Sequence, residues 1–469
     1  MANLQSARRI YCIGLKGVGL TGLAQLLKAQ GKEVWGSDTT ETFFTSEVLK
    51  RAGLECLEGF DAKHLDRPID LVIRSTAYGE TQVEVAAALA KKVPVLTYPE
   101  ALGQLVASHR AIAVAGSHGK TTTTALLAHV LEQAKLRPSA LVGSQVLGWQ
   151  GNALTGSSDL FVFEADEYQN KFQYFSPQVI VLTSLDWDHP DFFPTPEEYY
   201  AAFVSFLKRL PPDGFVVACY DDPTVVRAVA EAGLKPEQVV SYGLKSGTWR
   251  MVRMWLDQGR WTFSARQGEE FKGDFWLKLM GSHNVANALA VLAAASRLGV
   301  DFELIRAALP SFEGTSRRLE QKGKLTNGVT VVDDYAHHPT EISATLKALR
   351  AFYPYKYIRC VFQPHTFSRT SAFLPQFAQA FGEADEVVLL KTYASARDAG
   401  GGVDSEALLA EVKKYRPKAC YFATMGEAAD YLGHTAGRSD LVVTMGAGDV
   451  WQVGELLIKQ FGTVGHSEH

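Results

Sequence analysis

The chain has 469 residues, which is more than one hydrophobic core usually serves, so two to four domains are expected. Its 47 Lys and Arg residues nearly balance its 51 Asp and Glu residues, giving a net charge of −4. This balance gives no global attraction to nucleic acid or to an anionic membrane, and neither is expected as a partner.

The five cysteines are scattered along the chain and include no C-x-x-C pair. Their spacing argues against a disulfide framework or a thiolate metal site, and it favours a reducing, cytoplasmic location. The apolar run at 10–13 is too short for a secretory signal. No run approaches the ~20 apolar residues of a membrane span.

Short β-branched or aromatic runs alternate with helical patterns along the chain, which predicts α/β domains with mainly parallel sheets. In chain order the predicted strands are 10–13, 70–73, 111–115, 160–164, 179–182, 329–333, 358–362, 386–390 and 441–445. Helical periodicity follows several of them, as at 121–134 and 340–351. The Trp- and Gly-rich stretch 242–278 predicts a small β excursion. Breaks in these patterns divide the chain into 1–108, 109–310 and 311–469.

A first glycine motif follows the first predicted strand. Gly17, Val18 and Gly19 begin a G-x-G-x-x-G sequence, and Asp38 follows at about the spacing of a dinucleotide-binding fingerprint. Taken alone this motif predicts NAD binding and an oxidoreductase. The strand ends about three residues too early for that fingerprint, and such a turn also fits the pyrophosphate of a UDP-sugar. A purely structural strand–turn–helix is the third interpretation.

The strongest motif is a strand, a glycine-rich turn and a helix at 114–122. In such a turn free backbone N–H groups point at an anion, a Lys supplies charge for the β- and γ-phosphates, and a Thr hydroxyl can bind Mg²⁺. Val114 stands where the full phosphate-loop pattern has its first Gly, so a plain glycine-rich turn is the alternative. The residues predicted to bind ATP phosphates are Gly116, Ser117, His118, Gly119, Lys120, Thr121 and Thr122.

Acidic and imidazole groups follow the next two predicted strands. Glu164 ends an apolar run and begins the sequence E-A-D-E, and His189 closes D-W-D-H after the strand at 179–182. Carboxylates at the carboxyl edge of a parallel sheet face the ligand crevice, so Thr121, Glu164 and His189 are candidate Mg²⁺ ligands. Mg²⁺ prefers oxygen over an imidazole nitrogen. For any one of these residues a solvated turn is the alternative.

Together with five further motifs, these residues resemble the Mur ligase family in content and order, over essentially the whole chain. The motifs are G-S-H-G-K-T-T-T-T (116–124), E-A-D-E (164–167), D-W-D-H (186–189), G-S-H-N-V-A-N-A (281–288), F-E-G-T-S-R-R (312–318), D-D-Y-A-H-H-P-T-E (333–341), F-Q-P-H-T-F-S-R-T (362–370) and G-A-G-D (446–449). Eight ordered motifs make the resemblance specific.

The resemblance implies three domains: a Rossmann-like UDP-sugar-binding domain (1–108), a central P-loop ATPase domain (109–310) and a C-terminal Rossmann-like ligase domain (311–469). It implies a cytoplasmic, ATP- and Mg²⁺-dependent ligase that acts in peptidoglycan precursor synthesis, as a monomer or weak homodimer. The lactyl carboxylate of UDP-N-acetylmuramate would attack ATP to give an acyl phosphate, which the amine of L-alanine would then attack.

The resemblance also implies roles for individual residues. Catalytic roles fall to Lys120, Glu164, His189, Arg318 and His338. Beyond the phosphate loop, the implied ATP-binding residues are Asn284, Asn287, Arg318 and Asp334. The implied UDP-sugar site comprises Gly17, Val18, Gly19, Asp38, Ser75 and Thr76. The implied amino-acid site comprises Tyr335, His337, His338 and Arg369, with Arg369 on the carboxylate.

Two branches of the family remain as alternatives. The length of the segment between E-A-D-E and D-W-D-H, and the motif at 362–370, resemble the alanine-adding branch. Tyr168 instead resembles the branch that recycles murein peptides by adding a ready-made tripeptide to the same sugar. Thr366 replaces an Arg of some members, which leaves open whether a second Arg binds the amino acid. An NAD-dependent oxidoreductase and a non-catalytic nucleotide sensor are the alternatives from other classes.

Overall fold

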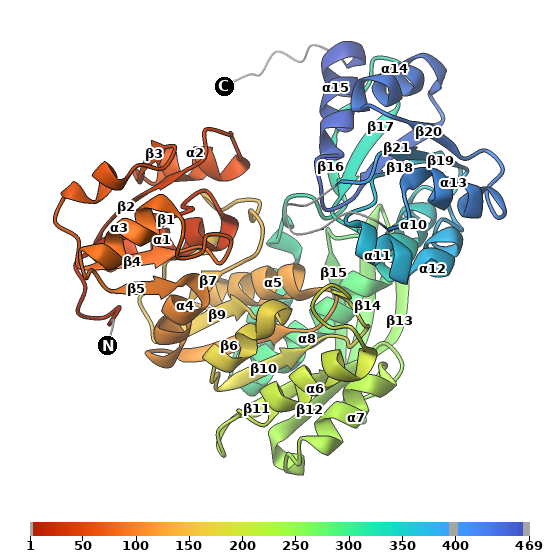
Figure 1. Cartoon of the computed structure of the whole chain (residues 1–469). Helices are drawn as coiled ribbons and strands as arrows, with labels where there is room; N and C mark the ends of the chain where they lie inside the picture. Colours follow the sequence, from red (N-terminus) through yellow and green to blue (C-terminus); the bar gives the residue numbers. More distant parts are fainter. Residues whose placement is uncertain (1–2, 394–401, 463–469) are drawn as a thin grey trace.

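The computed structural model describes residues 3–393 and 402–462. Their strands form three sheets of five, ten and six strands, which make three lobes in Figure 1. The three-domain α/β fold expected from the sequence is confirmed, while the boundaries at 108 and 310 stay predictions. None of the helices in the described ranges is both long and apolar enough to span a membrane.

The first sheet is fully parallel, with the order β3-β2-β1-β4-β5. Its strands are β1 (Arg9–Ile13), β2 (Glu33–Asp38), β3 (Glu55–Glu58), β4 (Leu71–Arg74) and β5 (Val95–Thr97). Its helices are α1 (Val18–Ala29), α2 (Phe44–Arg51), α3 (Val83–Ala90) and α4 (Tyr98–Ala107). The strand order reverses between β1 and β4, and ligands of open α/β sheets bind beyond the carboxyl ends of strands at such a point.

The central sheet has the order β15-β14-β13-β12-β11-β10-β6-β9-β7-β8. Its strands are β6 (Arg110–Ala115), β7 (Ser139–Leu141), β8 (Ala153–Leu154), β9 (Leu160–Glu164), β10 (Val179–Leu182), β11 (Phe215–Cys219), β12 (Val239–Gly243), β13 (Trp249–Asp257), β14 (Arg260–Gln267) and β15 (Glu270–Leu277). Strands β13 to β15 form an antiparallel meander, which confirms the predicted β excursion.

Helices cover both faces of the parallel part of this sheet. One core contains the apolar sides of α5 (Lys120–Gln133), α8 (Ser282–Arg297) and α9 (Phe302–Ala308). The other contains α6 (Pro196–Leu207) and α7 (Pro223–Glu231) and continues into the first domain through side chains of α1 and α4. The strands between these layers are buried on both sides, which explains why they read as continuous apolar runs.

The third sheet has the order β16-β17-β21-β18-β19-β20 and is parallel except for β16. Its strands are β16 (Glu320–Lys324), β17 (Thr330–Asp334), β18 (Tyr357–Phe362), β19 (Glu386–Leu390), β20 (Cys420–Phe422) and β21 (Asp440–Met445). Helices α10 (Pro339–Phe352), α11 (Phe367–Ala372), α12 (Leu374–Ala380) and α13 (Ser405–Lys413) contribute to one side. Helices α14 (Met425–Thr435) and α15 (Trp451–Phe461) cover the other.

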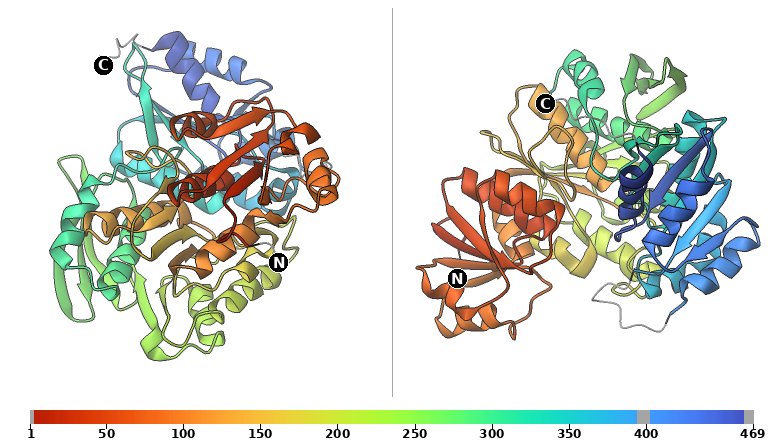
Figure 2. Two further views of the ribbon diagram at one scale, coloured as in Figure 1. Left: turned by 90° about the vertical axis from the view of Figure 1, so that its left-hand side faces the viewer. Right: turned by 90° about the horizontal axis from the view of Figure 1, so that it is seen from above.

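The first and third domains both lie against the central domain, as the views in Figures 1 and 2 agree. The fully buried amide of Asn152 joins the first domain to the second, since its Nδ2 donates to the carbonyls of Val18 at 2.9 Å and Val142 at 3.0 Å. The third domain meets the second at the loop after β10. There the Trp187 and Phe373 rings pack edge to face with centroids 5.2 Å apart.

Candidate functional site

The glycine-rich turn between β6 and α5 has the conformation that the sequence predicts. Gly116 and Gly119 have φ of +131° and +79°, values that side-chain-bearing residues rarely adopt. A Cβ at Gly116 would lie 2.2 Å from Oγ1 of Thr183, and one at Gly119 would lie 2.6 Å from Oδ1 of Asn287. Both glycines are therefore required by space as well as by backbone angle.

Lys120, the first residue of α5, lies under this turn. Its Nζ donates to the carbonyl of Gly116 at 2.5 Å and lies 3.1 Å from Oε2 of the fully buried Glu167. Burial alone would lower the pKa of this ammonium, but Glu167, Asp166 and Glu164 outweigh it and raise the pKa. Lys120 is therefore charged at neutral pH, as binding of a phosphate requires.

Thr121 and Glu164 form a pair of oxygen donors beside Lys120. The Thr121 hydroxyl donates to the Glu164 carboxylate at 3.0 and 3.1 Å, and Oε2 of Glu164 also accepts from the Gly143 amide at 2.9 Å. Burial raises the pKa of Glu164, with Lys120 acting in the opposite direction. A hydroxyl and a carboxylate suit a hard cation, so this pair fits Mg²⁺.

His189 belongs to a different cluster from Glu164. Ligand atoms of Asp166, Glu167 and His189 lie within 4.8 Å of one another, and His189 Nε2 lies 3.7 Å from Glu167 Oε1. Lys120 lies between the two groups, because Asp166 and Glu167 raise its pKa together with Glu164. The structure thus divides the predicted metal ligands into a Thr121–Glu164 pair and a His189 cluster that includes Glu167.

A cavity of about 220 Å³ opens beside the phosphate loop between the second and third domains. It is lined by seven of the residues predicted to bind ATP, namely His118, Gly119, Thr122, Asn284, Asn287, Arg318 and Asp334. The other predicted ATP residues, Gly116, Ser117, Lys120 and Thr121, lie in the same turn and first helical turn. Chain segments more than 200 residues apart thus line one cavity, and it contains residues predicted to bind a nucleotide.

The polar groups of this cavity are held by the surrounding backbone. Asn284 donates to the Met280 carbonyl at 2.8 Å, and Asn287 donates to Asn284 Oδ1 at 3.1 Å. The Asp334 carboxylate accepts from the amides of Leu319 and Ala336 at 2.7 and 2.8 Å. Burial nevertheless raises the pKa of Asp334 to about 6.

Arg318 reaches the cavity from the junction between the domains. Its guanidinium lies 3.8 Å from the Glu341 carboxylate and 5.2 Å from the centre of the Tyr335 ring. Tyr335 is therefore packed against the arginines of the junction, since Arg317 lies 5.1 Å from the same ring. The predicted amino-acid role of Tyr335 stays a prediction.

The predicted amino-acid residues face the loop that follows β10. The buried guanidinium of Arg369 contacts Asp188 through Nε at 2.9 Å and through Nη2 at 2.8 Å. Burial would raise the pKa of Asp188, but Arg369 outweighs it and holds that pKa well below its usual range. Burial also lowers the pKa of the nearby His337 to about 3, so this imidazole is neutral. The carboxylate partner of Arg369 in this structure is thus Asp188.

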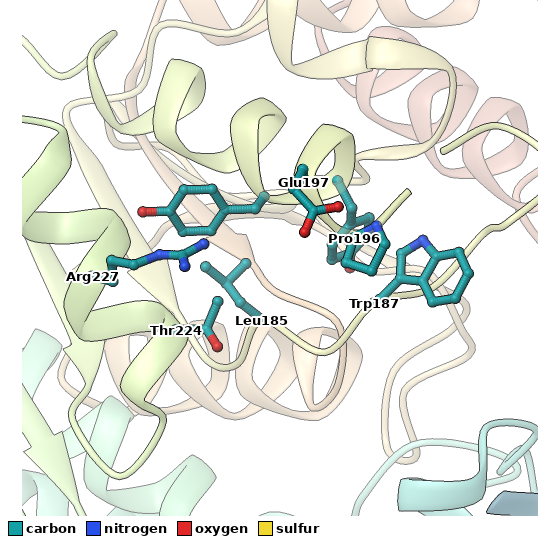
Figure 3. A pocket seen from close by; sticks show the side chains of 8 residues that line it. Leu185, Trp187, Pro196, Glu197, Thr224 and Arg227 are labelled. Atoms are coloured by element: carbon teal, nitrogen blue, oxygen red, sulfur yellow. The ribbon is translucent and has the colours of Figure 1, made fainter. Parts of the chain in front are cut away.

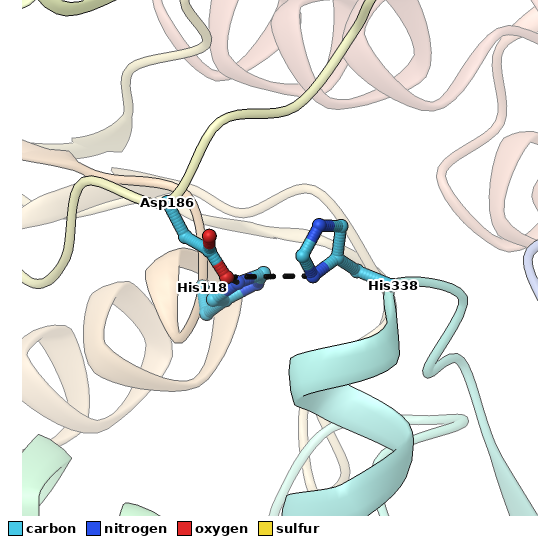
Figure 4. Close-up of side chains that lie close together, drawn as sticks. All are labelled: His118, Asp186 and His338. Carbon is cyan, nitrogen blue, oxygen red and sulfur yellow. Dashed lines mark hydrogen bonds and ion pairs between the residues drawn. The ribbon is translucent and has the colours of Figure 1, made fainter. Parts of the chain in front are cut away.

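His118 and His338 meet across the same boundary, as Figure 4 shows. Nε2 of His118 lies 3.0 Å from Oδ2 of Asp186, and Nδ1 of His338 lies 3.5 Å from the same oxygen. Nδ1 of His118 lies 3.2 Å from Glu341 Oε1. The phosphate loop is therefore linked to the N-terminus of α10.

The predicted UDP-sugar residues gather at the carboxyl edge of the first sheet. Asp38 accepts from the Lys16 amide at 2.7 Å, and the Ser75 amide donates to the Ile13 carbonyl at 2.9 Å. Thr76 follows Ser75, and Gly17 and Val18 begin α1 at the same edge. A Cβ on Gly19 would lie 2.6 Å from the Tyr98 ring, so this glycine has a packing reason within the domain.

A second cavity, of about 240 Å³, borders the loop after β10 (Figure 3). It is lined by Leu185, Trp187, Pro196, Glu197, Tyr199, Tyr200, Thr224 and Arg227. The Arg227 guanidinium covers the Tyr200 ring at 3.9 Å. None of these residues was predicted to bind a substrate, and we place the candidate site at the phosphate loop, where charged groups and glycines converge.

Sequence reasoning assigned no role to four acidic residues that the structure places in the site. These are Glu167, Asp186, Asp188 and Glu341, and each belongs to one of the family motifs. Tyr199 was missed altogether, although its hydroxyl lies 2.8 Å from Ser117 Oγ and donates to Glu167 at 3.2 Å. It lies inside an apolar helix, where the sequence offers no signal of such a contact.

Family models match most of the chain. The model described as Mur ligase family, catalytic domain, matches residues 9–110. The Mur ligase middle domain matches 114–295, and the Mur ligase, glutamate ligase domain, matches 317–448.

Relatives and solved structures agree with these matches. The UDP-N-acetylmuramate–L-alanine ligase of Desulfitobacterium hafniense is 39% identical over 96% of this chain and 99% of its own length. The structure of a UDP-N-acetylmuramate–alanine ligase from Thermotoga maritima has a TM-score of 0.81 at 26% identity, covering 96% of this chain and 98% of that one. A murein peptide ligase from Psychrobacter arcticus shares the fold, with a TM-score of 0.72 at 24% identity, covering 98% and 99%. The chain belongs to the Mur ligase family.

Proposed function

We propose that this protein is an ATP-dependent UDP-N-acetylmuramate–L-alanine ligase of peptidoglycan precursor synthesis. The observation that carries the proposal is the cavity between the second and third domains, beside a glycine turn that ends at Lys120. Its polar lining suits a nucleotide whose phosphates extend along the turn. The 39% identity to an alanine-adding ligase over nearly the whole chain supports the choice of substrates.

The reaction has two steps. An oxygen of the lactyl carboxylate attacks the γ-phosphorus of ATP, and ADP leaves. The nitrogen of L-alanine then attacks the acyl carbon, the bond from that carbon to the phosphate oxygen breaks, the nitrogen loses a proton, and phosphate departs. Such transfers depend on positioning and neutralisation of charge more than on covalent help from the protein. We assign neutralisation to Lys120 and Arg318.

Mg²⁺ would be held by Thr121 and Glu164, where the oxygen donors fit it, and would neutralise phosphate charge when bound. His189 with Asp166 and Glu167 offers a second candidate position. We further propose that the first domain holds the UDP-sugar at the carboxyl edge of its sheet. His337, His338 and Arg369 would face L-alanine, and the protein would act in the cytoplasm as a monomer or weak homodimer.

The recycling ligase is the second candidate, and Tyr168 is the observation that favours it. The Tyr168 ring lies 4.8 Å from the His189 ring, and its hydroxyl donates to Asp191 at 2.8 Å. An aromatic residue so near the reacting groups could contact a bulky tripeptide. The 39% identity to an alanine-adding ligase over nearly the whole chain favours L-alanine as the acceptor.

One assay separates these candidates. Phosphate release is measured with ATP and UDP-N-acetylmuramate, and L-alanine, glycine, L-serine and the tripeptide are compared as acceptors. We expect the highest kcat/KM with L-alanine. A higher value with the tripeptide would replace the proposal by the recycling ligase. No acceptor-dependent phosphate release, together with NAD binding at the first glycine motif, would reject both.

A further inference from the structure

His118, Asp186 and His338 place two imidazoles and a carboxylate around one point at the boundary between the second and third domains (Figure 4). His118 belongs to the phosphate loop, Asp186 to the loop after β10, and His338 caps the N-terminus of α10. One ligand atom from each lies within 4.8 Å of the other two. In a tetrahedral site with bonds of about 2.0 Å, ligand atoms lie roughly 3.3 Å apart, so little movement is needed to enclose an ion.

The kind of ligand selects the kind of ion. Two imidazole nitrogens and one carboxylate oxygen are characteristic of Zn²⁺ and similar transition-metal ions, and three protein ligands leave a fourth position for water. Mg²⁺ prefers oxygen donors at octahedral positions. The Thr121–Glu164 pair meets that preference, so the two sites differ in donor type.

Partners around the cluster already orient the ligand atoms. The second nitrogen of His118, Nδ1, lies 3.2 Å from Glu341, which is the carboxylate–histidine arrangement that fixes a metal-binding imidazole. Nδ1 of His338 accepts a hydrogen bond from the Thr340 amide at 3.3 Å, so this nitrogen carries the lone pair, and an ion would take it in place of the amide. The Thr340 hydroxyl donates to Oδ2 of Asp186 at 2.6 Å and holds the carboxylate in place.

We propose that His118, Asp186 and His338 form a binding site for a zinc-type ion that ties the third domain to the phosphate loop of the second. The site is distinct from the Thr121–Glu164 pair and from the cluster of Asp166, Glu167 and His189. It shares His118 with the nucleotide cavity and His338 with the proposed amino-acid site. Because two ligands come from one domain and one from the other, the ion is bound in full only when the domains are docked. A bound ion therefore slows their separation.

The test uses Co²⁺ as a visible stand-in for Zn²⁺, added to chelator-treated, full-length protein in excess Mg²⁺. We expect one equivalent of Co²⁺ to give tetrahedral absorption bands that Zn²⁺ then removes. His338→Ala and Asp186→Asn remove a ligand. Glu341→Gln removes the partner of His118 and should weaken binding by roughly ten- to a hundredfold, with a larger loss for the two ligand variants. Melting curves without metal establish that each variant is folded.

His189→Ala is the matched control, because it removes an imidazole from the other cluster and should leave the Co²⁺ bands intact. Loss of the bands in His189→Ala with retention in His338→Ala would overturn the proposal. Bands unchanged in every variant, or absent from the wild type, would overturn it as well. Zn²⁺ should also slow hydrogen exchange at 335–345 in the wild type. Binding without that effect would reject the tie between the domains.

Discussion

Lys120 lies between a loop built for phosphate and a group of buried carboxylates. We expect Lys120→Ala to lower kcat by about 100- to 1,000-fold, the usual cost of losing one group that stabilises the transition state. The measurement is acceptor-dependent phosphate release. Lys91→Ala, which removes an exposed lysine paired with Asp66 in the first domain, is the control. A kcat within twofold of the wild type would contradict the role of Lys120.

Arg369 is held by Asp188 through two of its nitrogens. We expect Arg369→Lys to raise the KM for L-alanine roughly ten- to a hundredfold, since a charged hydrogen bond contributes about 1.5–3 kcal/mol and an ammonium cannot reproduce the guanidinium geometry. The KM values for ATP and UDP-N-acetylmuramate should stay nearly constant. A raised KM for ATP with an unchanged KM for L-alanine would move Arg369 to the nucleotide site.

The buried carboxyl group of Asp334 makes the stability of the folded protein depend on pH. Its pKa rises from about 3.8 to about 6 on folding because the carboxyl is buried, so the protonated form is favoured in the folded protein. This contribution to stability is fully present below pH 3.8 and is lost as the pH rises through 6. Between these values the wild type should lose on the order of 3 kcal/mol relative to Asp334→Asn, which does not titrate.

Urea unfolding of both proteins between pH 4 and 7 measures this difference. The stability of the wild type relative to the variant should fall as the pH rises. A difference that stays constant over this range would show that Asp334 titrates normally.

Among the helices and strands, the contact of α1 with β7 and β8 joins the first domain to the second. Asn152→Ala removes the two hydrogen bonds that its Nδ2 donates and a longer one that its Oδ1 accepts from Gln25 at 3.4 Å, and it leaves two carbonyls without this donor. We expect the free energy of unfolding to fall by about 1–3 kcal/mol for each unsatisfied group. The first domain should also separate from the second more often. The rate of limited proteolysis between the first and second domains measures this separation.

Asn327→Ala is the matched control. It removes an amide that donates to the Ala436 carbonyl at 2.8 Å within the third domain. This variant should lose stability without faster cleavage next to the first domain. Equal cleavage in the two variants would show that Asn152 does not hold the domains together.

The sequence predicts nine strands correctly and misses others, including the largely buried β2 and the fully buried β11. All nine predicted strands lie within one residue of observed strands, because runs such as β10 are apolar on both faces. β16 was not predicted. Its sequence, E-Q-K-G-K, is charged, and it is a strand because it pairs with β17 at the sheet edge. Pairing of this kind depends on the neighbouring strand, which a local pattern cannot show.

The site also has parts that the sequence predicts and parts that it does not. The phosphate loop is a continuous motif, and its glycines and Lys120 were predicted from spacing. The partners of its side chains come from elsewhere: Glu341 lies 223 residues from His118, and Asp188 lies 181 residues from Arg369. Which carboxylate meets which cation depends on how the domains dock. The sequence alone therefore predicts that Arg369 binds the carboxylate of the amino acid and does not predict its pairing with Asp188.

The arrangement of the three domains predicts which ligand orders which segment. The nucleotide cavity has walls from the second and third domains, so a non-hydrolysable ATP analogue should slow hydrogen exchange at the N-termini of both α5 and α10. At about 100 times its Kd the analogue adds roughly 2.7 kcal/mol to the stability of the bound form. UDP-N-acetylmuramate alone should protect the carboxyl edge of the first sheet and leave α10 unchanged. Protection of α5 without α10 would contradict the shared cavity.

The position of the nucleotide cavity between the second and third domains also affects the turnover rate of the enzyme. A nucleotide bound between Asn287 of the second domain and Asp334 of the third would contact both domains, so we expect its release to require their separation. ADP release then waits for a movement of the third domain through solvent, and this movement sets an upper limit on kcat however fast the bonds are made. A turnover rate that falls in proportion to solvent viscosity would be the kinetic signature of that limit.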